Sequence, residues 1–244
     1  MIRTLEEYSL NAWPALQTVL FDGWVLRFAD GYTRRANSVN PLYAAHEALE
    51  DKLAGCEAYY RQRGLPVIFK ITPAVQPADL DAQLEAHGYA KDAATFVETL
   101  DLTQKQMQIS DAAIYTEVLT DDWLDDFSRM NLLTTERRQT LKKMLGNLQP
   151  QACYLVLKQD GQTVACGLGV LENGYVGLFD IYTDGQHRQR GYGTAAVESI
   201  LAWARAKGAH TAYLQVMQNN PPALKLYEKL GFKEVYSYWY RIKD

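Results

Sequence analysis

The chain has 244 residues, of which 48% are hydrophobic and 22% charged, and this composition excludes disordered, collagen-like and disulfide-scaffold proteins. Its 25 Lys and Arg against 29 Asp and Glu give a formal charge of −4, and neither sign forms a long block, so we expect no nucleic-acid or anionic-membrane partner. The first residues show no secretory pattern, and no apolar run approaches the roughly 18 residues of a membrane span, which predicts a soluble, untargeted protein.

The same order of elements is predicted twice along the chain. Residues 44–63 have helical periodicity, end at Gly64 and are followed by an apolar, β-rich run at 67–71. A proline-containing link then opens a short amphipathic helix. This helix should end at Gly88 in a left-handed conformation, before Tyr89 enters a strand.

The second occurrence of this order lies near the end of the chain. Residues 194–207 have helical periodicity, end at Gly208 and precede a strand-like run at 211–217. A proline-containing link and a short amphipathic helix follow, and that helix should end at Gly231 before Phe232 starts a strand. The alternative explanation is a chance recurrence of common helix and strand signals.

Polar residues 101–110 lack periodicity and form the natural linker between the two halves. The sequence therefore predicts two α/β half-molecules, at residues 1–105 and 106–244. Before its long helix the second half reads Arg-Gln-Arg-Gly-Tyr-Gly-Thr at 188–194, whereas the matching stretch of the first half, 37–42, contains no glycine. We expect the chemistry where the halves differ, and therefore in the second half.

Cysteine and histidine patterns indicate neither a disulfide framework nor a metal site. The three cysteines show no metal or redox spacing, and the four histidines lie more than twenty residues apart in sequence. These residues are Cys56, Cys153, Cys166, His46, His87, His187 and His210. We therefore expect no metal, no disulfide and a reducing cytoplasmic location.

A glycine-spaced loop follows the predicted strand 177–183 and opens a helix. Gly191 and Gly193 would let the backbone approach phosphate oxygens, and the first N–H groups of the helix would point toward them. Arg188 and Arg190 add positive charge at the same place. The loop lacks the third glycine of a dinucleotide fingerprint and the Lys-Ser/Thr of a Walker loop. Glycines also occur in ordinary strand-to-helix turns. The loop alone is therefore compatible with a phosphate site and with a purely structural turn.

Two motifs resemble those of the GNAT superfamily of acetyl-CoA-dependent N-acetyltransferases. The R-x-x-G-x-G at 188–193 resembles its pyrophosphate loop, and the segment from Asn220 to Phe232 resembles its N-x-x-A-x-x-L-Y-x-K-x-G-F pattern at every specified position. The resemblance covers about residues 175–235. One departure is Gly185, at a position of the turn where proline is common.

The resemblance implies a mixed α/β (α+β) protein with the acyl-CoA N-acyltransferase fold, built as two GNAT-like halves around splayed mixed sheets. In this interpretation residues 1–105 are a degenerate copy and residues 106–244 the catalytic domain. The first half lacks the glycines and has Leu84 where the second has Tyr227, when Gly88 is placed on Gly231. We expect the first half to bind no cofactor.

The resemblance also implies an acetyl-CoA site. The strand before the loop should splay from the next strand, so that the N–H groups of Ile181 and Thr183 face the pantetheine arm, although a plain buried strand is also compatible with the sequence. The implied cofactor-binding residues are Ile181, Thr183, Arg188, Gln189, Arg190, Gly191, Tyr192, Gly193, Thr194, Asn220 and Tyr227.

Two of the implied roles are catalytic. Tyr227 would protonate the departing thiolate, although it also belongs to an apolar helical stripe and could serve packing alone. Asp180, within the splaying strand, is the candidate general base, and Glu172 is the alternative. The non-catalytic explanation for a carboxylate at position 180 is a structural hydrogen bond. Asn220 before Pro221 is a favourable helix N-cap, and a hydrogen bond to the pantetheine would be additional.

The sequence therefore favours a cytoplasmic N-acetyltransferase that transfers acetyl from acetyl-CoA directly to a primary amine, since no cysteine or serine lies in a nucleophile arrangement. The alternatives are a longer acyl-CoA donor, or a CoA-binding sensor or interaction module without turnover. A small amine, an amino acid, an antibiotic, a peptide N-terminus and a protein lysine all remain possible acceptors. The chain could be a monomer or a homodimer.

Overall fold

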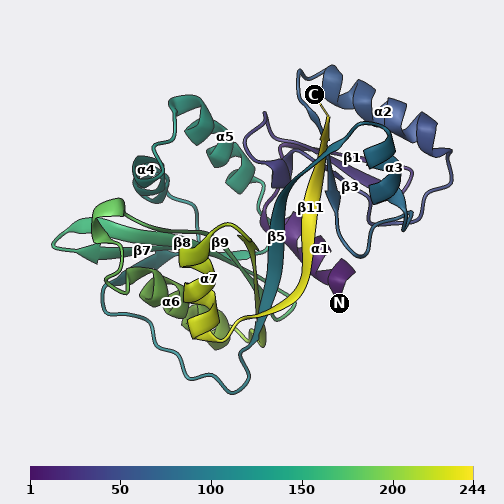
Figure 1. Ribbon diagram of the computed structural model, residues 1–244. Coiled ribbons are helices and arrows are strands. Elements are labelled where there is room, and N and C mark those ends of the chain that lie inside the picture. The colour runs from purple at the N-terminus through teal and green to yellow at the C-terminus, as the bar shows by residue number, and fades with distance from the viewer. Residues whose placement is uncertain (244) are drawn as a thin grey trace. The chain divides into compact units, whose positions relative to one another are not determined.

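A computed structural model describes residues 1–243, and their contacts divide the chain into two compact units (Figure 1). Unit 1 comprises Met1–Phe96 together with the final segment that begins at Tyr236, and unit 2 comprises Val97–Val235. These bounds differ from the predicted halves because the last strand pairs with a strand of unit 1. Within residues 1–243, no helix is both long and apolar enough to cross a bilayer.

Unit 1 contains a sheet with the strand order β1-β2-β3-β4-β11. Its elements are α1 (Ile2–Ala12), β1 (Gln17–Phe21), β2 (Trp24–Phe28), the 3-10 helix η1 (Arg34–Ala36), β3 (Val39–Asn40), α2 (Leu49–Arg61), β4 (Val67–Ile71), α3 (Leu80–Ala86), β5 (Ala90–Asp101) and β11 (Lys233–Lys243). Strands β3 and β4 are parallel, whereas β11 runs antiparallel to β4, with Tyr240 opposite Lys70. Both β5 and β11 contain a boundary between the two units.

The core of unit 1 is aromatic on the side of its sheet that carries α2. Trp24 and Tyr89 each contact Phe69 edge to face, at centroid distances of 5.5 and 5.4 Å. Tyr60 of α2 packs against the ring of Phe28 and donates its hydroxyl hydrogen to the Arg27 carbonyl. Because side chains alternate along a strand, the neighbouring Arg27 points to the other face.

The long helix predicted at 44–63 begins later, at Leu49. The prediction was wrong for residues 44–48 because the Asp22 carboxylate accepts hydrogen bonds from the backbone N–H groups of His46 and Glu47, at 2.8 and 2.9 Å. These two donors hold the pKa of Asp22 well below its ordinary value. Asp22, in the turn between β1 and β2, thus holds residues 44–48 in a non-helical conformation.

Unit 2 is built on a sheet with the order β6-β7-β8-β9-β10, followed by β5. Its elements are β6 (Ala113–Thr116), α4 (Asp121–Met130), α5 (Thr135–Gly146), β7 (Gln151–Gln159), β8 (Gln162–Glu172), β9 (Tyr175–Thr183), the 3-10 helix η2 (Gly185–His187), α6 (Tyr192–Ala206), β10 (Thr211–Met217) and α7 (Pro221–Leu230). In Figure 1, α4 and α5 lie on one side of β7, β8 and β9, and α6 and α7 lie on the other.

The predicted recurrence of element order is confirmed: α2, β4 and α3 in unit 1 correspond to α6, β10 and α7 in unit 2. Both short helices end at a left-handed glycine, Gly88 with φ +82° and Gly231 with φ +93°. In the first, the Leu84 carbonyl accepts from the Tyr89 N–H, and in the second the Tyr227 carbonyl accepts from the Phe232 N–H, both at 3.0 Å. This shared geometry supports placing Leu84 opposite Tyr227.

Glu98 of β5 is a buried carboxylate within unit 2. Its side chain is 8% exposed, and its Oε2 atom has no hydrogen-bond partner among residues 1–243. Burial, and then the neighbouring Glu234 and Glu228 carboxylates, raise the pKa of Glu98. The ionised form therefore costs folding free energy.

We expect Glu98→Gln to raise the free energy of unfolding at pH 8 by about 1 kcal/mol, because the amide carries no charge to desolvate. The pKa of Glu98 is higher in the folded than in the unfolded protein, where it is about 4.3. Below that pH the carboxyl is protonated in both states and costs no stability, and the loss of stability develops as the pH rises through the folded-state pKa. Urea unfolding of both proteins at pH 4 and pH 8 measures this. Glu234→Gln removes one neighbouring charge but leaves the buried carboxylate in place, so it should give a smaller gain than Glu98→Gln. An equal gain for Glu98→Gln at both pH values contradicts the explanation.

Candidate active site

A gap opens between β9 and β10. The parallel pairing of the two strands runs from Tyr175 opposite Thr211 to Leu178 opposite Leu214 and ends there. Nevertheless β9 continues to Thr183 and β10 to Met217. The prediction that this strand splays from the next one is therefore confirmed.

A β-bulge distorts β9 just beyond the point where the two strands separate. Leu168 of β8 lies opposite Phe179 and Cys166 lies opposite Tyr182, so two β9 residues, Asp180 and Ile181, span the space of one β8 residue. Asp180 has φ +50°, a left-handed conformation that is rare for a residue other than glycine. The bulge re-aims the backbone at the edge of the gap.

The backbone N–H group of Thr183 points away from β8. The Asp184 N–H donates to the Val164 carbonyl at 2.9 Å, and in an antiparallel pair successive residues direct their polar groups to opposite sides. Thr183 therefore directs its N–H group toward the side where β10 has diverged. Ile181 lies in the bulge, where this alternation is interrupted, and the direction of its N–H group stays a prediction. This orientation is the one an extended ligand in the gap would require.

The glycine loop ends at the N-terminus of α6. Gly191 is the N-cap with φ +85°, and no side chain among residues 1–243 caps this end of the helix. The first-turn N–H groups, on Tyr192, Gly193 and Thr194, have no partner within the helix and are directed outward from its end. Gln189, with φ +62°, is a second left-handed position in the loop.

Gly193 allows three elements to approach one another closely. A Cβ atom there would lie 3.0 Å from the Leu226 Cδ1 atom of α7 and 3.3 Å from the Thr183 Oγ1 atom of β9. Arg188, on the exposed side of the loop, lies with its Nε atom 3.5 Å from the Thr183 carbonyl oxygen. Arg190 is exposed as well. The loop thus combines backbone donors and two arginines at the open end of the gap.

Helix α7 starts and ends as predicted. The Asn220 side chain accepts from the Ala223 N–H at 3.4 Å, and Pro221 takes the first helical position, so the predicted N-cap is confirmed. Tyr227 is 9% exposed, and its ring contacts Phe232 edge to face at 5.7 Å. Packing of this ring is therefore established, and any chemistry must rest on its hydroxyl.

The two candidate bases lie on neighbouring strands, Asp180 on β9 and Glu172 at the end of β8. Asp180 is in the bulge. Burial is the largest cause that raises the pKa of the Cys166 thiol on β8, and the Asp180 carboxylate is the second. Glu172, the last residue of β8, lies opposite Tyr175 of β9, and Tyr175 is five residues before Asp180, or about 16 Å along an extended strand. Asp180 is thus the carboxylate beside the gap.

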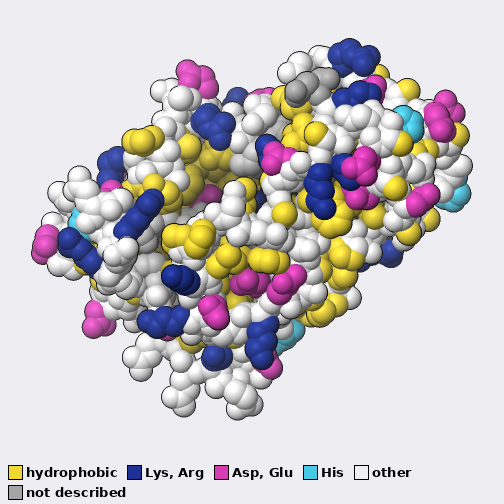
Figure 2. Space-filling view, viewed as in Figure 1, with side chains coloured by type: hydrophobic (Ala, Val, Ile, Leu, Met, Phe, Trp, Pro, Cys, Tyr) yellow, Lys and Arg dark blue, Asp and Glu magenta, His cyan; other side chains and the backbone are white. Residues whose placement is uncertain are grey.

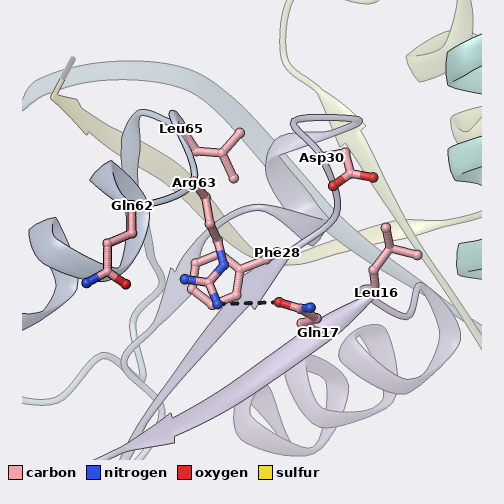
Figure 3. Close-up of a pocket in the computed structure, with 7 residues that line it drawn as sticks. All are labelled: Leu16, Gln17, Phe28, Asp30, Gln62, Arg63 and Leu65. Carbon is pink, nitrogen blue, oxygen red and sulfur yellow. Dashed lines mark hydrogen bonds between the residues drawn. The ribbon is translucent and has the colours of Figure 1, made fainter.

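Two cavities in unit 1 contain none of the predicted site residues. One, of about 530 Å³, is drawn in Figure 3, where the Arg63 guanidinium lies over the Phe28 ring and donates to Gln17. The other, of about 270 Å³, is lined in part by Trp24 and Lys52. Figure 2 shows cationic and anionic side chains interspersed on the face in view, without an extended patch of one sign.

Comparison with known proteins decides the family. The family described as "Probable histone acetyltransferase Rv0428c C-terminal" matches residues 1–241. The chain belongs to this family. It is a GNAT superfamily N-acetyltransferase, and an uncharacterized N-acetyltransferase of Bacillus subtilis, YobR, is 30% identical to it across 99% of this chain and 98% of that protein.

Solved GNAT structures share the fold. A GCN5-related N-acetyltransferase from Kribbella flavida aligns with a TM-score of 0.71 and 13% identity over 99% of this chain and 95% of that one. A tandem GNAT protein from the clavulanic acid biosynthesis pathway aligns with a TM-score of 0.67 and 13% identity over 98% and 87%. Within residues 1–243 no three His, Cys, Asp or Glu side chains are grouped as a metal ion would need, and the three cysteines are free and buried.

Sequence reasoning missed one group of residues at this site. Arg129 of α4 lies 3.7 Å from the Asp184 carboxylate, at the turn that leads from β9 into the glycine loop. No motif marks Arg129, because the contact joins positions more than fifty residues apart.

Proposed function

We propose that this chain uses acetyl-CoA and transfers its acetyl group to a primary amine, with the cofactor site in unit 2. The observation that carries the proposal is the end of the β9–β10 ladder at Leu178 and Leu214, beside the uncapped N-terminus of α6 at Gly191. An extended pantetheine arm could pair with the open strand edge in the gap. The pyrophosphate would be bound by the N–H groups at the start of α6 and by the positive charges of Arg188 and Arg190.

The proposed reaction is a direct transfer. The amine nitrogen attacks the thioester carbonyl carbon, backbone N–H groups of β9 stabilise the oxygen that becomes negative, and the C–S bond then breaks. Asp180 accepts the proton that the amine loses, directly or through water, and Tyr227 supplies a proton to the departing thiolate. Asn220 holds the start of α7, and an additional hydrogen bond to the pantetheine is part of the proposal.

We further propose that unit 1 is a degenerate GNAT-like copy that binds no cofactor, so that the protein is of the tandem type. Before α2, Asp22 already binds the N–H groups of His46 and Glu47. On the same side of the unit 1 sheet, the Trp24 indole N–H donates to the Gln76 carbonyl at 2.9 Å. These contacts occupy the region where unit 2 has its glycine loop and open gap.

A reducing, cytoplasmic location fits the three free, buried cysteines and is part of the same proposal. The acceptor is an amine whose identity a screen with thiol release as readout would establish. That screen also separates acetyl-CoA from longer acyl donors, and turnover by any donor contradicts a sensor role.

Calorimetry should find one acetyl-CoA site per chain, and Gly191→Ala should weaken it by about tenfold or more. A Cβ at Gly191 has no neighbour within 4 Å, so the substitution acts through φ, which must leave the left-handed region and turn the N–H groups away from the phosphates. Gly208→Ala is the matched control, because Gly208 also has a positive φ (+91°) and open space but lies at the other end of α6. Two equivalent sites, or equal affinities for both variants, contradict the proposed site.

A further inference from the structure

The turn between β9 and the glycine loop is fixed by the Asp184 side chain. Its Oδ1 atom accepts from the Gln186 N–H at 2.9 Å and lies 3.3 Å from His187 Nδ1. The hydrogen bond from the Gln186 backbone is the largest cause that lowers the pKa of Asp184, and the contact with the His187 side chain is the second. Asp184 therefore stays ionised and stabilises η2 from the N-cap position.

Arg129 joins this turn to α4. One guanidinium nitrogen lies 3.7 Å from Asp184 Oδ2, and the other donates to the Thr163 carbonyl at 3.1 Å and to Asp126 Oδ1 at 3.3 Å. Asp126 is in turn fixed, because its Oδ2 atom accepts from the Thr163 hydroxyl at 2.6 Å. Contacts with α4 and β8 thus orient the guanidinium independently of its contact with the turn.

We propose that Arg129 and Asp184 form a positioning tether that holds the glycine loop in the geometry that binds the pyrophosphate of coenzyme A. This inference rests on the proposed function. The loop begins at Arg188, only four residues after Asp184, and the intervening Gly185 contributes little stiffness of its own. The tether supplies the restraint that this turn sequence lacks.

Position 185 offers an independent way to restore that restraint. Gly185 is the first residue of η2, where a proline costs no helical hydrogen bond, and a Cβ there has no neighbour within 4 Å. Asp184 has φ −50° and ψ 138°, the extended conformation that a residue before proline adopts. Gly185→Pro should therefore fit the turn as it stands and stiffen it.

The test is a calorimetric cycle with coenzyme A as the probe. Arg129→Met should weaken binding by about 2- to 5-fold, the range expected for a partly exposed ion pair. Gly185→Pro alone should leave the affinity at the wild-type value, within the error of the titration. The double variant should return to that value, because the proline replaces the lost restraint.

Arg138→Met is the matched control. Arg138 of α5 pairs with Asp121 and Asp125 of the same helix α4, and neither partner belongs to the turn. A structural contribution of α4 would lower the thermal midpoint in both arginine variants, whereas only Arg129→Met should lose affinity.

Wild-type affinity in Arg129→Met overturns the tether, and so does a loss that Gly185→Pro fails to restore. If wild-type protein itself does not bind coenzyme A, the proposed function fails and the tether fails with it. The two failures are thus distinguished by the wild-type titration.

Discussion

Replacing Lys70 by Met should lower the free energy of unfolding by about 3–5 kcal/mol, because it leaves a buried carboxylate without its cation. Glu6 of α1 is 0% exposed, and its Oε2 atom lies 2.5 Å from the Lys70 ammonium of β4. Its Oε1 atom accepts from the Tyr236 hydroxyl at 2.6 Å. Without Lys70, the Tyr236 hydroxyl and the electrostatic attraction of the buried Arg27 guanidinium would be left to stabilise the charge. Urea unfolding at pH 7 measures the loss.

The matched control is the double variant Glu6→Gln with Lys70→Met. A glutamine can still accept from Tyr236 and carries no charge to desolvate, so the double variant should lose less than Lys70→Met alone. Additive losses, or a loss below about 1 kcal/mol for Lys70→Met, would show that the pair contributes little.

The three groups of this cluster come from α1, β4 and β11, and this explains what the sequence could not predict. The periodicity of residues 211–217 and the glycines at 88 and 231 report local geometry, so the elements themselves were predictable. The pairing of Trp239–Lys243 with Val67–Ile71 joins segments about 170 residues apart, and no local pattern encodes it. For this reason the predicted halves and the compact units end at different residues.

The same distinction holds within the site. Gly191 and Asn220 were predictable because a left-handed N-cap and a side-chain N-cap each depend on a few neighbouring residues. The bulge at Asp180 depends on how β8 and β9 pair, and the partnership of Arg129 with Asp184 depends on how α4 packs. Such features follow from tertiary contacts, which a single sequence does not reveal.

Tyr227→Phe should lower kcat by roughly 10- to 100-fold while the KM for acetyl-CoA changes little. General-acid catalysis is typically worth about 10²- to 10⁴-fold, and a thiolate already leaves fairly well, so the low end applies. The ring keeps its contact with Phe232, so stability should change by no more than about 1 kcal/mol. Steady-state kinetics of the purified variant, with an acceptor from the amine screen, measure the effect.

Tyr227→Leu is the control that separates the hydroxyl from the ring, and unit 1 carries leucine at the corresponding position, Leu84. Both variants should lose the same factor in kcat because both lack the hydroxyl, but only the leucine variant should also lose stability, since it removes the aromatic contact. If Tyr227→Phe keeps full activity and only Tyr227→Leu is impaired, the residue serves packing and another group protonates the thiolate. A wild-type protein that binds acetyl-CoA but turns over no amine would instead be a sensor, for which neither substitution changes a rate.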